Sequence, residues 1–152
     1  MNDQTSSPPP DPALGRRHQA RRSLLQALYA WELGGRRVTS STLVEEFLRR
    51  TKVGDEAYFR DVLSGALSTV DETRASCAPC LDRPWDLVDP VERSILMLAT
   101  YELRARSDVP QPVVLDEAIE LAREFGAPDS HRFVNAVLDR LRRSLPALPT
   151  TG

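Results

Sequence analysis

The sequence is poor in the residues from which most enzyme sites are built. Its 152 residues include only two histidines, His18 and His131. A catalytic triad or a His-rich metal site is therefore hard to assemble. The seven glycines are scattered along the chain and form no phosphate-binding loop. From these shortages we expect no enzymatic activity, no metal site and no cofactor.

Cysteine is equally scarce, and the two that occur have CxxC spacing in Cys77-Ala-Pro-Cys80. No second cysteine pair or nearby histidine completes a zinc site around them. The pair also lacks the strand-then-helix setting of a thioredoxin motif. We therefore predict a solvated loop here, with no redox or metal function.

Long apolar runs and targeting segments are also missing. No stretch approaches the ~18–20 consecutive apolar residues of a membrane span. Residues 1–15 lack a basic start followed by an apolar core, so we predict no signal peptide. Because two cysteines make no disulfide framework, we expect a cytoplasmic protein without a membrane partner. The 41% apolar content is that of an ordinary globular domain.

Lysine is nearly absent, because 19 of the 20 basic residues are arginine and only Lys52 is lysine. The net charge of −2 conceals an uneven distribution. Residues 14–37 carry a net charge of +5, whereas residues 38–102 carry −5. Such asymmetry suggests one surface for a polyanion and another for a basic partner. Solvated arginine-rich helix faces would give the same pattern, so charge alone leaves both interpretations open.

Hydrophobic periodicity predicts helices and no strand. A disordered Pro-rich arm is expected over residues 1–15, a helical domain over 16–145 and a disordered tail over 146–152. We predict an all-α bundle of six or seven helices. The expected helices span residues 16–33, 42–51 (with a capping box of Thr42 and Glu45), 55–76, 85–88 (a short helix or turn), 89–103, 112–125 and 129–145.

The first of these helices has an unusual outward face. Arg22, Gln26 and Tyr29 stand at positions i, i+4 and i+7, opposite the apolar stripe. A guanidinium, an amide and an aromatic ring are the groups that recognise single-stranded RNA. This positive surface is extended toward the N-terminus by Arg16, Arg17 and Arg21.

The start of the last helix supplies a second candidate for RNA binding. Its first turn contains Ser130 and Arg132, and Phe133 lies at the edge of the apolar stripe. The free N–H groups and the positive dipole end of a helix N-terminus attract phosphate. The alternative is that Asp129 is a helix cap and Phe133 belongs to the core.

Several ordered motifs resemble the bacterial NusB family. They comprise residues 17–21 and 26–29 in the first helix, 89–103 in the middle, and 108–110, 117–122 and 125–135 toward the end. The resemblance covers residues 16–143 approximately. His18 and Gln19 depart from the pattern, because relatives usually have more basic residues there.

The resemblance implies an all-α NusB-like fold of two small lobes without enzymatic activity. It also implies binding of the boxA element of nascent ribosomal RNA transcripts, pairing with the ribosomal protein NusE, and assembly with RNA polymerase and other Nus factors. The implied RNA-binding residues are Arg16, Arg17, Arg21, Arg22, Gln26, Tyr29, Asp129, Ser130, Arg132 and Phe133. The implied NusE-binding residues are Asp86, Val88 and Glu92, which lie in the acidic middle of the chain.

Two alternatives to an RNA-binding antitermination factor remain. A similar helical domain precedes some RNA cytosine methyltransferases, but these 152 residues contain no Gly-rich loop and no catalytic-type cysteine motif. The other alternative is a self-associating structural module, because some NusB proteins form homodimers that could hide the RNA-binding face.

Overall fold

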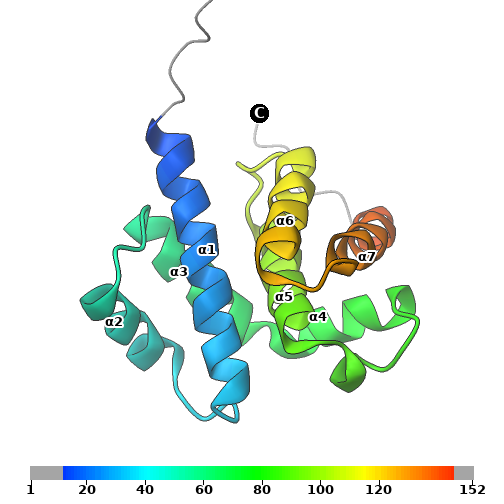
Figure 1. The fold of residues 1–152 in the computed structure, drawn as a ribbon, viewed down its shortest axis with the longest axis horizontal. Helices are drawn as coiled ribbons and strands as arrows, with labels where there is room; N and C mark the ends of the chain where they lie inside the picture. The colour runs from blue at the N-terminus through cyan, green and yellow to red at the C-terminus, as the bar shows by residue number, and fades with distance from the viewer. Residues whose placement is uncertain (1–11, 146–152) are drawn as a thin grey trace, which may run out of the picture.

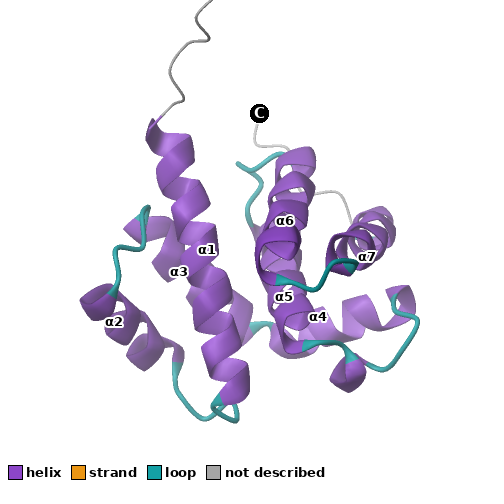
Figure 2. Ribbon diagram, viewed as in Figure 1, coloured by secondary structure: helices purple, strands orange, loops and turns teal. Residues whose placement is uncertain are grey.

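A computed structural model describes residues 12–145, which form seven α-helices, two short 3₁₀ turns and no strand (Figure 2). This confirms the all-α prediction. The elements are α1 (Pro12–Leu33), α2 (Ser40–Arg50), α3 (Glu56–Ser68), α4 (Val70–Cys77), η1 (Ala78–Cys80), η2 (Trp85–Leu87), α5 (Pro90–Ala105), α6 (Gln111–Phe125) and α7 (Ser130–Ser144). The tail predicted over 146–152 and residues 1–11 of the predicted arm lie outside the described residues.

The helices form two groups that share one core. In Figure 1, α1, α2 and α3 lie on the left and α4 to α7 on the right, with α5 between neighbours on both sides. Ile95, Leu96 and Met97 of α5 are fully buried, as its nearly all-round apolar sequence predicts. The buried side chains of both groups form a single continuous hydrophobic cluster. Because α5 contacts helices of both groups, it is the element that joins them. Burial of each large apolar side chain in this cluster contributes ~1.5–3 kcal/mol.

Two helices begin earlier than their sequences suggest. α1 starts at Pro12 rather than at Arg16, because proline is well suited to the first turn of a helix. α2 starts at Ser40, and its cap is Thr39, whose hydroxyl accepts a hydrogen bond from the backbone N–H of Thr42 at 3.3 Å. The capping box predicted at Thr42 is therefore wrong. Four hydroxyl residues in succession offer competing caps that the sequence alone does not rank.

The helix predicted over 55–76 is divided at Thr69. The hydroxyl groups of Ser68 and Thr69 both donate to the carbonyl oxygen of Gly65, at 3.0 and 2.7 Å. Such side-chain bonds compete with the helical pattern, and α3 ends there. Gly65 also lies against the ring of Tyr101, where any Cβ would overlap the ring. This contact brings α3 and α5 close together.

Candidate nucleic-acid interface

The outward face of α1 is joined to the end of α6. The guanidinium of Arg22 forms an ion pair with Glu124 at 2.5 Å and lies 5.8 Å from the centroid of the Phe125 ring. Gln26, one turn further along α1, is exposed, and Tyr29, about two turns further, is half-buried. These three residues therefore do share one side of α1, and Arg22 fixes that side against the last turn of α6.

The end of α6 leads directly into the second candidate segment. Gly126 follows Phe125, and a Cβ there would clash with the Ser130 side chain and the Ala122 carbonyl oxygen. This tight reversal starts α7 beside the end of α6, and Figure 1 shows α6 lying between α1 and α7. Two segments that are far apart in the sequence thus approach the same end of α6.

The basic residues at the start of α1 differ in their surroundings. Arg16 is exposed and has no ion pair or side-chain hydrogen bond within residues 12–145. Arg17 lies 4.4 Å over the ring of Tyr58 and is shared between Asp55, at 3.6 Å, and Asp108, at 3.7 Å. Arg16 therefore presents an uncompensated charge to solvent, whereas the charge of Arg17 is largely neutralised.

Arg21 does not belong to the exposed basic surface, and that prediction is wrong. The residue is only 3% exposed, and its guanidinium donates to both carboxylate oxygens of Glu102, at 3.1 and 3.2 Å. It also donates to the Tyr58 hydroxyl at 3.3 Å. Burial acts to lower the pKa of Arg21, but the Glu102 carboxylate outweighs it and the pKa is raised. The buried ion pair between Arg21 and Glu102 links α1 to α5.

The start of α7 presents one acidic and one basic side chain that have no side-chain partner in the part of the chain that the structure describes. Asp129 is exposed and occupies the N-cap position of α7, as predicted, but its side chain makes no capping hydrogen bond. Its backbone carbonyl instead accepts from the N–H of Arg132 at 3.1 Å. The Arg132 side chain is exposed and forms no ion pair with any described residue. Carboxylate and guanidinium are thus both free to meet a ligand.

The other two predicted residues of α7 are less accessible. Ser130 is buried, and its side chain acts to lower the pKa of the Glu92 carboxyl. Phe133 is half-buried and packs against the hydrophobic core. The guanidinium carbon of Arg83 lies 4.9 Å from the centroid of the Phe133 ring. Sequence reasoning did not single out Arg83, because residues 83 and 133 come together only in the folded chain.

Only one of the three residues predicted to bind a basic protein partner lies on the surface. Asp86 is exposed and pairs with Arg74 at 2.8 Å, whereas Val88 is 1% exposed and Glu92 is 7% exposed. Direct contact through the Val88 and Glu92 side chains is therefore excluded in this conformation. Burial raises the pKa of Glu92, and hydrogen bonds from Ser130 and from the Asp89 backbone oppose that rise.

Leu87 is the exposed residue of this segment that the sequence did not reveal. Its side chain is 71% exposed, while Trp85 in the same turn is buried. In a 3₁₀ turn the residues at i and i+3 lie on one side, so Trp85 and Val88 face the core together and Leu87 faces outward. The spacing of Trp85 and Val88 is the signal that could have identified it.

Arg93 holds this turn in place. Its guanidinium donates to the backbone carbonyls of Val88, at 2.7 Å, and Asp86, at 3.2 Å. It also pairs with Glu32 at 3.1 Å, and the Glu32 side chain is only 2% exposed. The segment that carries Leu87 is thereby tied to the end of α1.

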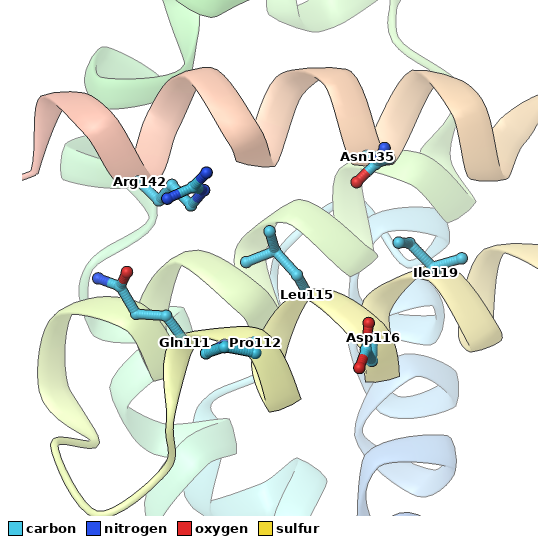
Figure 3. A pocket seen from close by; sticks show the side chains of 7 residues that line it. All are labelled: Gln111, Pro112, Leu115, Asp116, Ile119, Asn135 and Arg142. Atoms are coloured by element: carbon cyan, nitrogen blue, oxygen red, sulfur yellow. The ribbon is translucent and has the colours of Figure 1, made fainter.

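The grooves on the surface do not resemble an enzyme site. Figure 3 shows the groove between α6 and α7, about 330 Å³ in volume, in which Leu115 and Ile119 are accompanied by Gln111, Asn135 and Arg142. A second groove of about 380 Å³ lies between the start of α1 and the start of α6. Neither groove is lined by histidine, cysteine or serine. Within residues 12–145 no three His, Cys, Asp or Glu side chains are grouped to hold a metal ion.

The CxxC motif does not form the predicted solvated loop. Cys77 ends α4, Cys80 ends η1, and both side chains are buried. Burial raises the pKa of the Cys77 thiol to about 11 and also raises that of Cys80. The thiols are therefore small core residues rather than reactive groups.

Among the described helices, none is long and apolar enough to cross a membrane.

Comparison with known proteins gives consistent matches over most of the chain. The NusB family model matches residues 18–143. The transcription antitermination protein NusB of Shewanella amazonensis is 47% identical over 82% of this chain and 93% of its own length. That of Shewanella loihica is 45% identical over the same shares.

Solved structures show the same fold. The T. maritima NusB structure superposes with a TM-score of 0.76 at 28% identity, covering 84% of this chain and 91% of that one. A structure of the antitermination factors NusB and NusE in complex with dsRNA gives a TM-score of 0.75 at 21% identity, covering 87% and 99%. The match to the family model runs from within α1 to within α7.

Proposed function

The chain belongs to the NusB family of transcription antitermination proteins, and we propose that it acts by binding boxA RNA of nascent ribosomal RNA transcripts together with the ribosomal protein NusE. The family is non-enzymatic. In this proposal the protein is a cytoplasmic adaptor between RNA and the antitermination complex formed by RNA polymerase and other Nus factors.

The convergence of α1 and α7 at the end of α6 is the observation that carries the RNA assignment. The Arg22–Glu124 pair joins α1 to the last turn of α6, and the start of α7, with Arg132 and Phe133, follows that turn closely in the chain. This supports one RNA-binding side that also includes Gln26 and Tyr29. Single-stranded RNA is bound by combining phosphate contacts from arginine, stacking on aromatic rings and amide contacts to base edges. All three kinds of group are present on this side.

The free charges determine where phosphates bind. Arg16 and Arg132 have no carboxylate partner among the described residues, so phosphate contact at either breaks no ion pair seen there. Arg22 and Glu124 are each about 40% exposed, and such surface pairs contribute only ~0–1 kcal/mol. Arg22 can therefore exchange its carboxylate for a phosphate at small cost. Arg21 contributes by holding α1 on α5 rather than by touching RNA.

The turn around Leu87 is the proposed docking site for NusE. Leu87 supplies an exposed apolar anchor, and Asp86 beside it supplies a carboxylate for a basic ribosomal protein. Arg93 fixes both by holding the backbone of the turn. Glu92 is buried in the first turn of α5, directly after this segment, so its side chain is not offered to the partner in this proposal.

A binding titration tests the RNA assignment. Fluorescence anisotropy of labelled boxA RNA is compared with that of a scrambled RNA of equal length and composition, for the wild type and Arg132→Ala. We expect tighter binding of boxA, and weaker binding by the variant. Arg60→Ala is the matched control, because Arg60 is an exposed arginine on α3 that pairs with Glu45 and Glu56. Equal affinity of the wild type for both RNAs would refute the assignment.

The NusE site is tested by truncating its anchor. Leu87→Ala should weaken NusE binding by about tenfold or more, measured by isothermal titration calorimetry, because buried apolar anchors dominate interface energies. Leu14→Ala is the control, since Leu14 is similarly exposed but lies at the start of α1. Equal NusE affinity for the two variants would remove Leu87 from the interface.

A further inference from the structure

The side chain that covers Phe133 is placed to take part in RNA binding. We propose that Arg83 is a further RNA-contacting residue, stacked on Phe133 and offering its outer face to a nucleobase and its free N–H groups to a phosphate. The inference rests on the proposed function, because it extends the same RNA-binding side. It adds a residue from the segment between η1 and η2 to those supplied by α1 and α7.

The position of Arg83 follows from what surrounds the Phe133 ring. The ring packs against the core, and the Arg83 guanidinium carbon lies over it at 4.9 Å from the centroid. This is within the ~6 Å range of a cation–π contact. A base that approaches this part of the molecule therefore meets the guanidinium together with the ring. Because a guanidinium is planar, it can stack on an aromatic ring with one face and on a base with the other.

Asp82 orients the guanidinium and leaves part of it free. The Nε of Arg83 donates to Asp82 Oδ1 at 2.8 Å, and Nη2 donates to Oδ2 at 3.3 Å. Its Nη1 group has no partner among the described residues. The Arg83 side chain is 42% exposed, so this free edge is accessible to a ligand. One edge is thus fixed in direction while the other can donate to phosphate oxygens or to a base edge.

The segment that carries Arg83 is anchored to α7. Arg140 of α7 donates to the backbone carbonyl of Cys80 at 3.1 Å, and the Cys80 side chain is buried. The buried Trp85 anchors the other end of the segment. The distance from Arg83 to Phe133 is therefore set by the fold. Arg132, which is exposed and has no ion pair with a described residue, lies on the same first turn of α7 and adds a second positive charge near Arg83 and Phe133.

The segment also connects the RNA side to the proposed NusE site. Residues 82–84 lead directly into η2, whose Leu87 is the exposed anchor. A partner that binds this turn therefore lies only a few residues from Arg83. RNA contact at Arg83 would place the two ligands side by side.

The test compares Arg83→Ala, Arg83→Lys and Arg60→Ala with the wild type in titrations of labelled boxA RNA. Arg83→Ala should weaken binding by about tenfold, which is typical of losing one stacked base. For this variant, the slope of the logarithm of the association constant against the logarithm of salt concentration should be shallower by roughly 0.7, because one phosphate contact is lost. Arg83→Lys keeps the charge and loses the stacking plane, so its affinity should be intermediate with the wild-type salt slope. Arg60→Ala should bind like the wild type.

Arginine footprinting on the unmodified protein gives an independent readout that needs no variant to fold. Phenylglyoxal modification followed by mass spectrometry should show Arg83 protected by boxA RNA and Arg60 unprotected. An Arg83→Ala variant that folds and binds as tightly as the wild type, or more tightly, would overturn the inference while the wild-type preference for boxA stands. Absence of protection at Arg83 would overturn it as well. A wild type that does not distinguish boxA from scrambled RNA would refute the proposed function and this inference with it.

Discussion

Among single residues, the arginines of α1 are separated by what surrounds them. Arg16 is exposed and has no ion-pair partner within residues 12–145, Arg17 is shared between two aspartates, and Arg21 is buried against Glu102. The pattern of α1 alone could not separate these roles, because the partner of Arg21 lies on α5. The signal that points to it is Glu102 itself, an acid on a helix that is otherwise buried almost all round and therefore needs a basic partner.

Removing Arg21 should destabilise the fold far more than removing Arg17. Arg21→Ala leaves the Glu102 carboxylate buried without a partner, and we expect a loss of about 3–5 kcal/mol in the free energy of unfolding. Arg17→Ala breaks only partly exposed pairs and should cost less than about 1 kcal/mol. Urea unfolding followed by circular dichroism measures both. Equal losses would show that the Arg21–Glu102 pair is not a structural link between α1 and α5.

The two thiols should be unreactive in the folded protein. With the pKa of Cys77 at about 11, only about 0.1% of that thiol is ionised at pH 8, and its side chain is fully buried. Ellman's reagent at pH 8 should therefore react slowly with native protein and rapidly with protein unfolded in guanidinium. Fast titration of both thiols under native conditions would contradict this and would reopen a redox role for the CxxC motif.

Among the elements, helix existence was predictable and helix ends were not. Apolar periodicity located all the long helices, because each buries one face in the shared core. Their ends depend on local hydrogen bonds that compete closely, as at Thr39 and at Thr69. The side chain of Asp129, at the N-cap position of α7, makes no capping hydrogen bond for the same reason. There the backbone carbonyl of Asp129, rather than its carboxylate, accepts the hydrogen bonds from the N–H groups of Arg132 and Phe133.

Because its carboxylate is free, Asp129 should affect RNA binding rather than stability. Asp129→Asn removes a negative charge beside the proposed phosphate contacts, and we expect boxA binding to tighten by about fivefold, equivalent to ~1 kcal/mol of repulsion. Its melting temperature should not change. Asp89→Ala is the comparison, because the Asp89 carboxylate accepts from the Val91 N–H at 2.9 Å and its loss should cost ~1 kcal/mol of stability. Unchanged RNA affinity for Asp129→Asn would argue against phosphate near this carboxylate.

For the whole molecule, folding changes the meaning of the charge pattern. The sequence assigns +5 to residues 14–37, yet four of those arginines form ion pairs in the fold, namely Arg17, Arg21, Arg22 and Arg36. Their partners include Asp55, Glu102 and Glu124, which come from other elements. The positive surface is therefore smaller than the sequence suggests. Composition could reveal the asymmetry but not this pairing, which depends on tertiary contacts.

A small positive surface predicts a weak salt dependence. If Arg16, Arg83 and Arg132 make the phosphate contacts while Arg22 keeps its pair with Glu124, the logarithm of the boxA association constant should fall with the logarithm of salt concentration with a slope of about −2. Exchange of that pair for a phosphate at Arg22 would bring the slope to about −3. Titrations at several salt concentrations measure the slope directly. A much steeper slope would mean that the paired arginines also release their carboxylates and bind phosphate.

A titration of boxA RNA with and without NusE is the most direct test of the proposal that the protein binds the two ligands together. The proposed RNA residues and the turn around Leu87 are joined through Arg83, which lies over Phe133 and precedes the turn in the chain, so the two ligands should bind cooperatively. We predict that saturating NusE tightens boxA binding by about tenfold, within the usual range of coupling between sites, and leaves scrambled RNA unaffected. An identical boxA affinity with and without NusE, or equal affinity for boxA and scrambled RNA, would contradict it.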